Sequence, residues 1–147
     1  MEQIRQIDPV KILKEKFQEQ FLDFLETSET RFYILIDKKD LLEIVDFVFN
    51  ELKARYQIVT GMDTPQGIEI VYHFAFDRHG KVISLRVILP HDNPEVESIS
   101  LIITGAQWIE REIIELLGVT FLHHPDPRKF LMSDDWPEGV YPLRRKK

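Results

Sequence analysis

The sequence predicts an α+β fold: a two-layer sandwich with helices on one face of a mostly antiparallel sheet, followed by an extended C-terminal arm. Three observations indicate this class. Helix-like and strand-like hydrophobic periods alternate along residues 1–118. Three strand-like segments follow one another across short turns. Residues 119–147 carry half of the chain's eight prolines. We therefore expect an α+β domain over residues 1–118 and an arm over residues 119–147.

The N-terminal third predicts two helices with a strand between them. Apolar residues recur at spacings of three and four over residues 10–26, which predicts an amphipathic helix; they are Val10, Leu13, Phe17, Phe21, Leu22 and Leu25. Asp8 and Pro9 supply an N-cap and a first helical residue. The apolar run 32–36 predicts a strand, and Asp37 is placed to cap a second helix over residues 38–56.

The middle of the chain predicts three strands, over residues 57–63, 68–76 and 81–89, and the last two show the alternation that is typical of a strand. Turn residues at 65–67 and 77–80 separate them. Residues 96–103 are compatible with a short strand or a connector. A third helix is expected over residues 106–117, with Thr104 as its cap and Gly118 at its end.

The composition narrows the classes of function. A chain of 147 residues, 44% hydrophobic, is typical of one globular domain. It has no cysteine, which excludes disulfides, thiolate metal sites, cysteine-ligated iron–sulfur clusters and cysteine nucleophiles. The net charge of -6 argues against nucleic-acid binding. No apolar run approaches the roughly 18 residues that a membrane helix needs, and no signal-peptide pattern opens the chain, so we expect a soluble cytoplasmic protein.

The third predicted helix carries a cluster of charge at Glu110, Arg111, Glu112 and Glu115. One interpretation is a solvated helix face. A second is that Glu110, Arg111 and Glu112 form buried or interfacial ion pairs with a partner protein. A third, a general acid–base pair of carboxylates, lacks an accompanying nucleophile in the sequence.

The histidines permit a second class of function, a stand-alone metal-dependent enzyme that uses His91, His123 and His124. Adjacent residues of an extended chain point apart, however, so His123 and His124 would rarely bind one ion. The sequence also lacks a glycine-rich phosphate loop, a nucleophile elbow and a zinc-protease helix motif. It therefore presents no recognisable catalytic apparatus.

Two further features of the C-terminal region suggest contact with another molecule. Trp108 and Trp136 either complete the small core or serve as anchors of an interface. The basic end Arg144–Lys147 is either solvated or docks on a partner or an anionic lipid surface.

Four motifs in residues 108–144 resemble, in order, the 30 kDa subunit family of respiratory complex I, which is shared with energy-converting membrane-bound nickel–iron hydrogenases and related archaeal complexes. They read Trp108-Ile-Glu-Arg-Glu112, Gly118-Val-Thr-Phe121, His124-Pro-Asp-Pro-Arg128 and Trp136-Pro-Glu-Gly139 with Pro142-Leu-Arg144. The family commonly continues with Lys-Asp, whereas this chain has Arg145, Lys146 and Lys147. The role of that basic end does not carry over.

The resemblance implies a non-catalytic subunit of the peripheral arm of a membrane-bound, ion-translocating redox complex, at the cytoplasmic face of the membrane. Such a subunit would hold no cofactor and would scaffold a large catalytic-type subunit and a small iron–sulfur subunit. Iron–sulfur clusters, and nickel–iron in the hydrogenase branch, would belong to those partners. The residues expected to dock are those of the motifs: Trp108, Glu110, Arg111, Glu112, Phe121, His124, Pro125, Asp126, Arg128, Trp136, Gly139, Pro142, Leu143 and Arg144.

Overall fold

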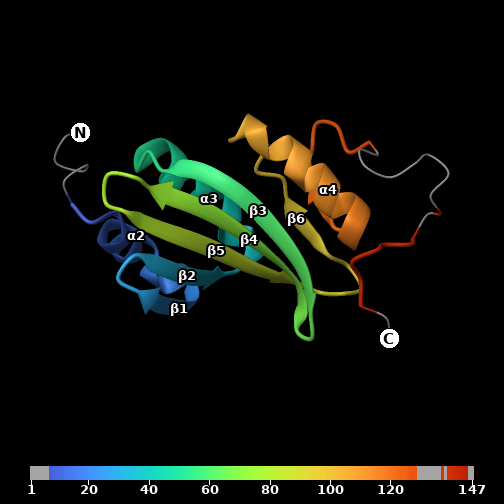
Figure 1. Ribbon diagram of the computed structural model, residues 1–147, viewed down its shortest axis with the longest axis horizontal. Coiled ribbons are helices and arrows are strands. Elements are labelled where there is room, and N and C mark those ends of the chain that lie inside the picture. The colour runs from blue at the N-terminus through green and yellow to red at the C-terminus, as the bar shows by residue number, and fades with distance from the viewer. Residues whose placement is uncertain (1–6, 129–136, 138, 146–147) are drawn as a thin grey trace. The chain divides into compact units, whose positions relative to one another are not determined.

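The computed structural model describes residues 7–128, 137 and 139–145 (Figure 1). The chain divides into two compact units. Unit 1 comprises residues 1–58 and 71–87, and unit 2 comprises residues 59–70 and 88–147. Three strands run through both units: β3 (Arg55–Thr64), β4 (Gly67–Phe76) and β5 (Lys81–Leu89).

A five-stranded sheet with the order β1-β2-β5-β4-β3 confirms the predicted α+β class. The strands β1 (Phe21–Ser28) and β2 (Arg31–Ile36) form an antiparallel hairpin. The short turns between β3, β4 and β5 also join antiparallel neighbours. The pair β2 and β5 is parallel, with Phe32 opposite Ile83, so the sheet is mixed.

The helices of unit 1 lie on one side of its strands (Figure 1). They are α2 (Pro9–Phe17), with Asp8 as its N-cap, and α3 (Leu41–Asp46). A 3₁₀ turn, η2 (Lys38–Asp40), precedes α3, and a π-helical turn, η3 (Phe47–Glu51), follows it. The apolar faces of the two helices and of β2 form a buried core: Val10, Leu13, Phe17, Phe32, Ile34, Ile36, Leu41, Ile44, Val45 and Val48.

The prediction of a helix through residue 26 was wrong. The helix α2 ends at Phe17, the 3₁₀ turn η1 (Gln18–Gln20) follows, and residues 21–28 form β1. Phe21 and Phe24 stack with their ring centroids 6.2 Å apart, and Phe24 also contacts Phe32 of β2. Pairing with β2 and these aromatic contacts outweigh a helical spacing that only part of the segment shows. The second helix is also shorter than predicted, because helical structure stops at residue 51.

Unit 2 is built around α4 (Gln107–Leu117) and two short parallel strands, β6 (Glu95–Glu97) and β7 (Thr120–Leu122). Gly118 ends α4 in the left-handed conformation, at φ 73°, as predicted. Thr104 does not cap α4: it begins a 3₁₀ turn, η4 (Thr104–Ala106), and the first helical turn has no side-chain cap. The rest of the segment 96–103 is a connector.

The helix α4 packs closely on β3 within unit 2. Gly61 lies under it, and a Cβ at that position would approach Leu117 to 2.8 Å. Ile113 and Leu117 fill the space that a larger side chain would take. Among the residues that the structure describes, no helix combines the length and the apolar character needed to span a bilayer.

Candidate partner-docking site

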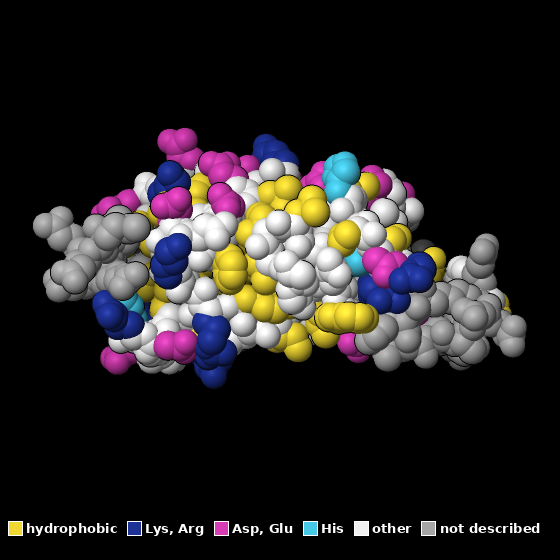
Figure 2. Space-filling model, turned by 90° about the horizontal axis from the view of Figure 1, so that it is seen from above, with side chains coloured by type: hydrophobic (Ala, Val, Ile, Leu, Met, Phe, Trp, Pro, Cys, Tyr) yellow, Lys and Arg dark blue, Asp and Glu magenta, His cyan; other side chains and the backbone are white. Residues whose placement is uncertain are grey.

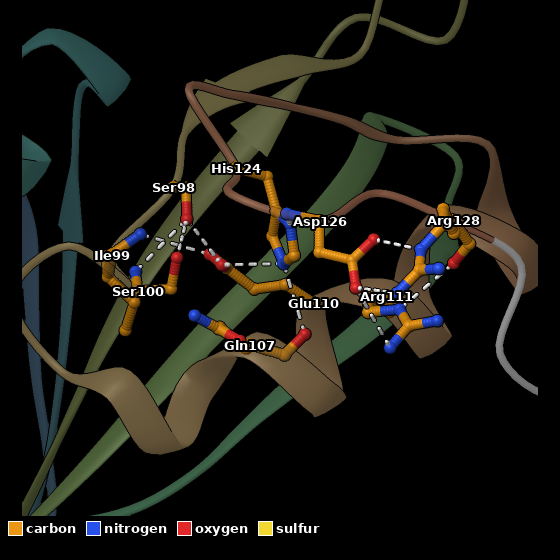
Figure 3. Close-up of polar contacts among 9 residues, drawn as sticks. All are labelled: Ser98, Ile99, Ser100, Gln107, Glu110, Arg111, His124, Asp126 and Arg128. Atoms are coloured by element: carbon orange, nitrogen blue, oxygen red, sulfur yellow. Dashed lines mark hydrogen bonds and ion pairs between the residues drawn. The ribbon is translucent and has the colours of Figure 1, made fainter.

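The carboxyl group of Glu110 is the buried centre of the site (Figure 3). It accepts hydrogen bonds from the Ser98 hydroxyl at 2.6 Å and from the Ile99 backbone N–H at 3.1 Å. Ser98 and Ser100 lie 2.7 Å apart between their hydroxyl oxygens. These contacts join α4 to the connector that follows β6, and they give the connector a fixed conformation.

Burial raises the pKa of Glu110 to about 7, because removal from water disfavours the charged form. The hydrogen bonds from Ser98 and Ile99 act in the opposite direction but only partly compensate. A carboxyl group that titrates near neutrality is suited to general acid–base chemistry. Glu110 is fully buried, however, so a substrate has no access to it in this conformation.

His124 lies on the side of the Glu110 carboxyl group away from Ser98, and its ring is buried there (Figure 3). Its side chain is 1% exposed, and its Nε2 lies 3.1 Å from the Gln107 carbonyl and 3.8 Å from Glu110. The Asp126 N–H donates to Nδ1 at 3.0 Å. Since Nδ1 accepts and the Gln107 carbonyl can only accept, we assign the proton of the neutral ring to Nε2. The ring thus fixes the chain direction after β7.

Arg111 ties α4 to the start of the arm. Its Nε donates to the Arg128 carbonyl at 3.0 Å, and its Nη1 lies 3.9 Å from Asp126. Arg128 forms a two-point pair with Asp126, at 2.6 and 2.8 Å, and this pair lowers the pKa of Asp126 to about 2. The Arg111 guanidinium also lies over the Trp108 ring, 5.4 Å from its centroid.

Residues 139–145 are held at the C-terminal end of α4. Arg144 donates from Nε to the Leu117 carbonyl at 2.6 Å and from Nη1 to the His91 carbonyl at 3.1 Å. The Leu143 N–H donates to the Leu116 carbonyl at 2.9 Å. The last carbonyls of a helix have no partner within the helix, so Arg144 and Leu143 act as its cap.

An open cleft of about 770 Å³ lies beside this cap, lined by Asp63, Thr64, Pro65, His91, Asp92, Gly139, Tyr141, Arg144 and Arg145. Asp63 bridges its two sides: it accepts from the Arg145 N–H at 2.8 Å, and its other oxygen lies 2.7 Å from His91 Nε2. The bond from Arg145 is the main reason that the pKa of Asp63 is lowered. Basic and acidic groups are mixed here, so the cleft has no strong preference for one sign of charge.

The predicted docking residues fall into three groups. Glu110, Arg111, His124, Asp126, Arg128 and Arg144 contact groups of this chain, and Phe121 is buried. Trp108, Pro125, Gly139, Pro142 and Leu143 are exposed, and Glu112 is partly exposed. Trp136 lies outside the described residues. Sequence reasoning missed Ser98, Ser100 and Asp63. The two serines, separated by one residue, were the only available signal for the first two.

The three histidines of the metal hypothesis have separate partners. His91 contacts Asp63, His123 contacts Glu97 and His124 contacts the Gln107 carbonyl. Within residues 7–128, 137 and 139–145, no group of three metal-ligating side chains comes together. His123 and His124 do point toward different partners, as their adjacency predicts.

Comparison with known proteins identifies the family. The chain is 34% identical over 139 residues to a subunit of the F(420)H(2) dehydrogenase of Methanosarcina mazei, covering 92% of this chain and 87% of that protein. It is 29% identical over 141 residues to a subunit of the NADH-quinone oxidoreductase of Geobacter metallireducens, covering 90% and 83% of the two chains.

A solved structure of the membrane-bound sulfane sulfur reductase, an archaeal respiratory membrane complex, contains a chain of the same fold. The TM-score is 0.79 at 23% sequence identity, over 92% of this chain and 81% of that one. The family model described as respiratory-chain NADH dehydrogenase, 30 Kd subunit, matches residues 34–147, which include all four motifs. The chain therefore belongs to the 30 kDa subunit family of the respiratory-chain NADH dehydrogenase.

Proposed function

We propose that this chain is a non-catalytic subunit of a membrane-bound, ion-translocating redox complex, in the peripheral arm at the cytoplasmic face of the membrane. The observation that carries the proposal is the family match over residues 34–147. The two relatives are named as subunits of a dehydrogenase and of a quinone oxidoreductase, and the alignments span most of each chain. A subunit of such a complex has partner subunits.

The geometry of the site supports a structural role. The residue with the most perturbed carboxyl group, Glu110, is enclosed by Ser98, Ile99 and His124. Arg111 and Arg144 donate to backbone carbonyls of the same chain. These groups hold residues 124–128 and 139–145 in defined conformations, so less conformational entropy would be lost when a partner binds.

We propose that the partners are the large catalytic-type subunit and the small iron–sulfur subunit of the same complex. The electron carriers would then lie in those subunits: iron–sulfur clusters, with nickel–iron in a hydrogenase-type complex. This chain has no cysteine with which to ligate a cluster. The surface offered to the partners includes the exposed motif residues Trp108, Pro125, Pro142 and Leu143.

Purification of the complex from its own membranes tests this function. The full chain would carry an affinity tag at its N-terminus, in a strain that lacks the untagged copy, and membranes would be solubilised in a mild detergent. We expect mass spectrometry to identify a large redox subunit and a small iron–sulfur subunit in the purified material, with iron present in that complex.

Recovery of the chain alone, from the soluble fraction, would count against the proposal. Metal analysis of the separately expressed chain addresses the second hypothesis, the stand-alone metal enzyme. One tightly held equivalent of zinc or iron per chain would support that hypothesis and contradict a cofactor-free subunit.

A further inference from the structure

The outer surface of α4 carries one row of side chains that are exposed or partly exposed. The helix turns Glu110, Ile113 and Leu117 into the interior of unit 2. Arg111, on a second side, is covered by its contacts with Asp126 and Arg128. The remaining side carries Trp108, Glu112 and Leu116, spaced four residues apart, which places them in one row.

Leu143 extends this row beyond the helix. Its N–H donates to the Leu116 carbonyl, so it lies next to the last residue of the row, and it is 54% exposed. Trp108, at the other end, is 56% exposed. Figure 2 shows one face of the molecule, on which hydrophobic side chains reach the surface among acidic and basic ones. A Trp that is more than half exposed on a rigid helix is the kind of side chain that dominates binding energy in interfaces.

Glu112 gives the row its chemical specificity. It is the acidic residue between Trp108 and Leu116, and within the described part of the chain its carboxylate forms no hydrogen bond or ion pair. A partner that covers the row removes this carboxylate from water, which is costly unless the partner supplies a cation. The row therefore requires an apolar surface with a Lys or Arg at its centre.

A second copy of this chain does not meet that requirement. A two-fold axis through the middle of the row would place one Glu112 against the other, and like charges at that distance repel. Eight residues of helix measure only about 12 Å, so the row is the centre of an interface rather than the whole of it.

We propose that the row Trp108–Glu112–Leu116–Leu143 is the contact centre for a subunit of a different sequence, which covers it with apolar side chains and pairs a basic side chain with Glu112. This inference rests on the proposed function and assigns the contact to one side of one helix. In this arrangement Arg111 and Arg144 fix the conformation of this chain by donating to its backbone carbonyls. The row itself contacts the partner subunit.

The test uses the tagged full chain in its own membranes, with three variants. Trp108→Ala removes the anchor, and Glu112→Arg places a cation opposite the expected cation. Glu51→Arg makes the same charge reversal at an exposed site in unit 1 and is the control. We expect the first two variants to lower the affinity for the partner subunits about thirty-fold or more. The control should recover them like the wild type.

Thermal unfolding of each purified variant separates docking from folding, and the unfolding temperatures should stay within about 3 °C of the wild type. Full recovery of the partner subunits with both Trp108→Ala and Glu112→Arg overturns the inference. A concentration-dependent dimer of the free chain that Trp108→Ala abolishes also overturns it, in favour of a second copy. If the wild-type chain recovers no redox subunit, the proposed function itself fails, and that result is distinct from the other two.

Discussion

Replacing Glu110 with Gln should change how the stability of the chain depends on pH. The pKa of the buried carboxyl is about 7, against 4.5 for the unperturbed group. The folded state therefore binds the proton more tightly than the unfolded state does. The stabilisation from this proton is fully present below pH 4.5 and is lost as the pH rises through 7.

The magnitude follows from the two pKa values. The separation between about 7 and 4.5 corresponds to about 3 kcal/mol over the whole pH range. Between pH 5 and pH 8 the wild type should lose about 2–3 kcal/mol of unfolding free energy through this group. Gln cannot ionise, so the unfolding free energy of Glu110→Gln lacks this dependence on pH. The altered hydrogen bonds to Ser98 and Ile99 change that free energy by the same amount at every pH.

Urea unfolding at pH 5, 6, 7 and 8 measures this effect. The quantity to follow is the unfolding free energy of Glu110→Gln minus that of the wild type, because groups common to both proteins cancel. This difference should rise by about 2–3 kcal/mol across the series. Glu112→Gln, which removes a carboxylate from the outer side of the same helix, is the control for loss of charge alone. A flat difference for Glu110→Gln would show that burial does not hold the proton, and the reasoning would be refuted.

Three further outcomes are expected. Gly118→Ala should destabilise the chain by more than about 1 kcal/mol, because a Cβ would meet the Tyr141 ring in a left-handed position; adding Tyr141→Ala should restore part of the loss in urea unfolding. Arg144→Met should cost about 2–3 kcal/mol and speed hydrogen exchange at residues 139–145, since two carbonyls lose a charged donor. In carboxyl NMR titrations Asp126 should titrate near pH 2, and Arg128→Met should raise that midpoint; an unchanged midpoint would contradict the pairing.

The sequence predicted the elements whose pattern is local. Residues 68–76 and 81–89 each carry apolar residues at every second position along one face and form β4 and β5, and Gly118 ends α4 as its position implies. The parallel pairing of β2 with β5 was not predicted, because it joins segments about fifty residues apart and leaves no local trace. Residues 21–26 were assigned to a helix because Phe21 and Leu25 fit its period, and the strand partner that decided their conformation was not visible in that window.

For the site, the sequence located the region but not the direction of its side chains. Trp108 and Leu143 are exposed, as docking residues should be. Glu110 and Arg144 were expected to face a partner, and the structure gives both of them partners within the chain. The partner of Glu110 lies in the connector at 98–100, and the partner of Arg144 lies at the end of α4. Both partners are distant in sequence, so a local pattern could not predict these contacts. Whether the exposed residues dock remains the prediction tested above.

The parallel neighbours β2 and β5 also bear on the order of folding. The antiparallel hairpin β1–β2 and the antiparallel meander β3–β4–β5 close only short loops. Each can form early at little entropic cost. Joining them requires a loop of about fifty residues, which includes α3, to close. During synthesis, unit 1 would stay incomplete until residue 87 had left the ribosome, with the apolar edge of β2 uncovered until then. The slow step of folding should therefore be the docking of the preformed hairpin on the preformed meander. Substitutions at Phe32 or Ile83 should slow folding more than substitutions in the turns within the hairpin or the meander.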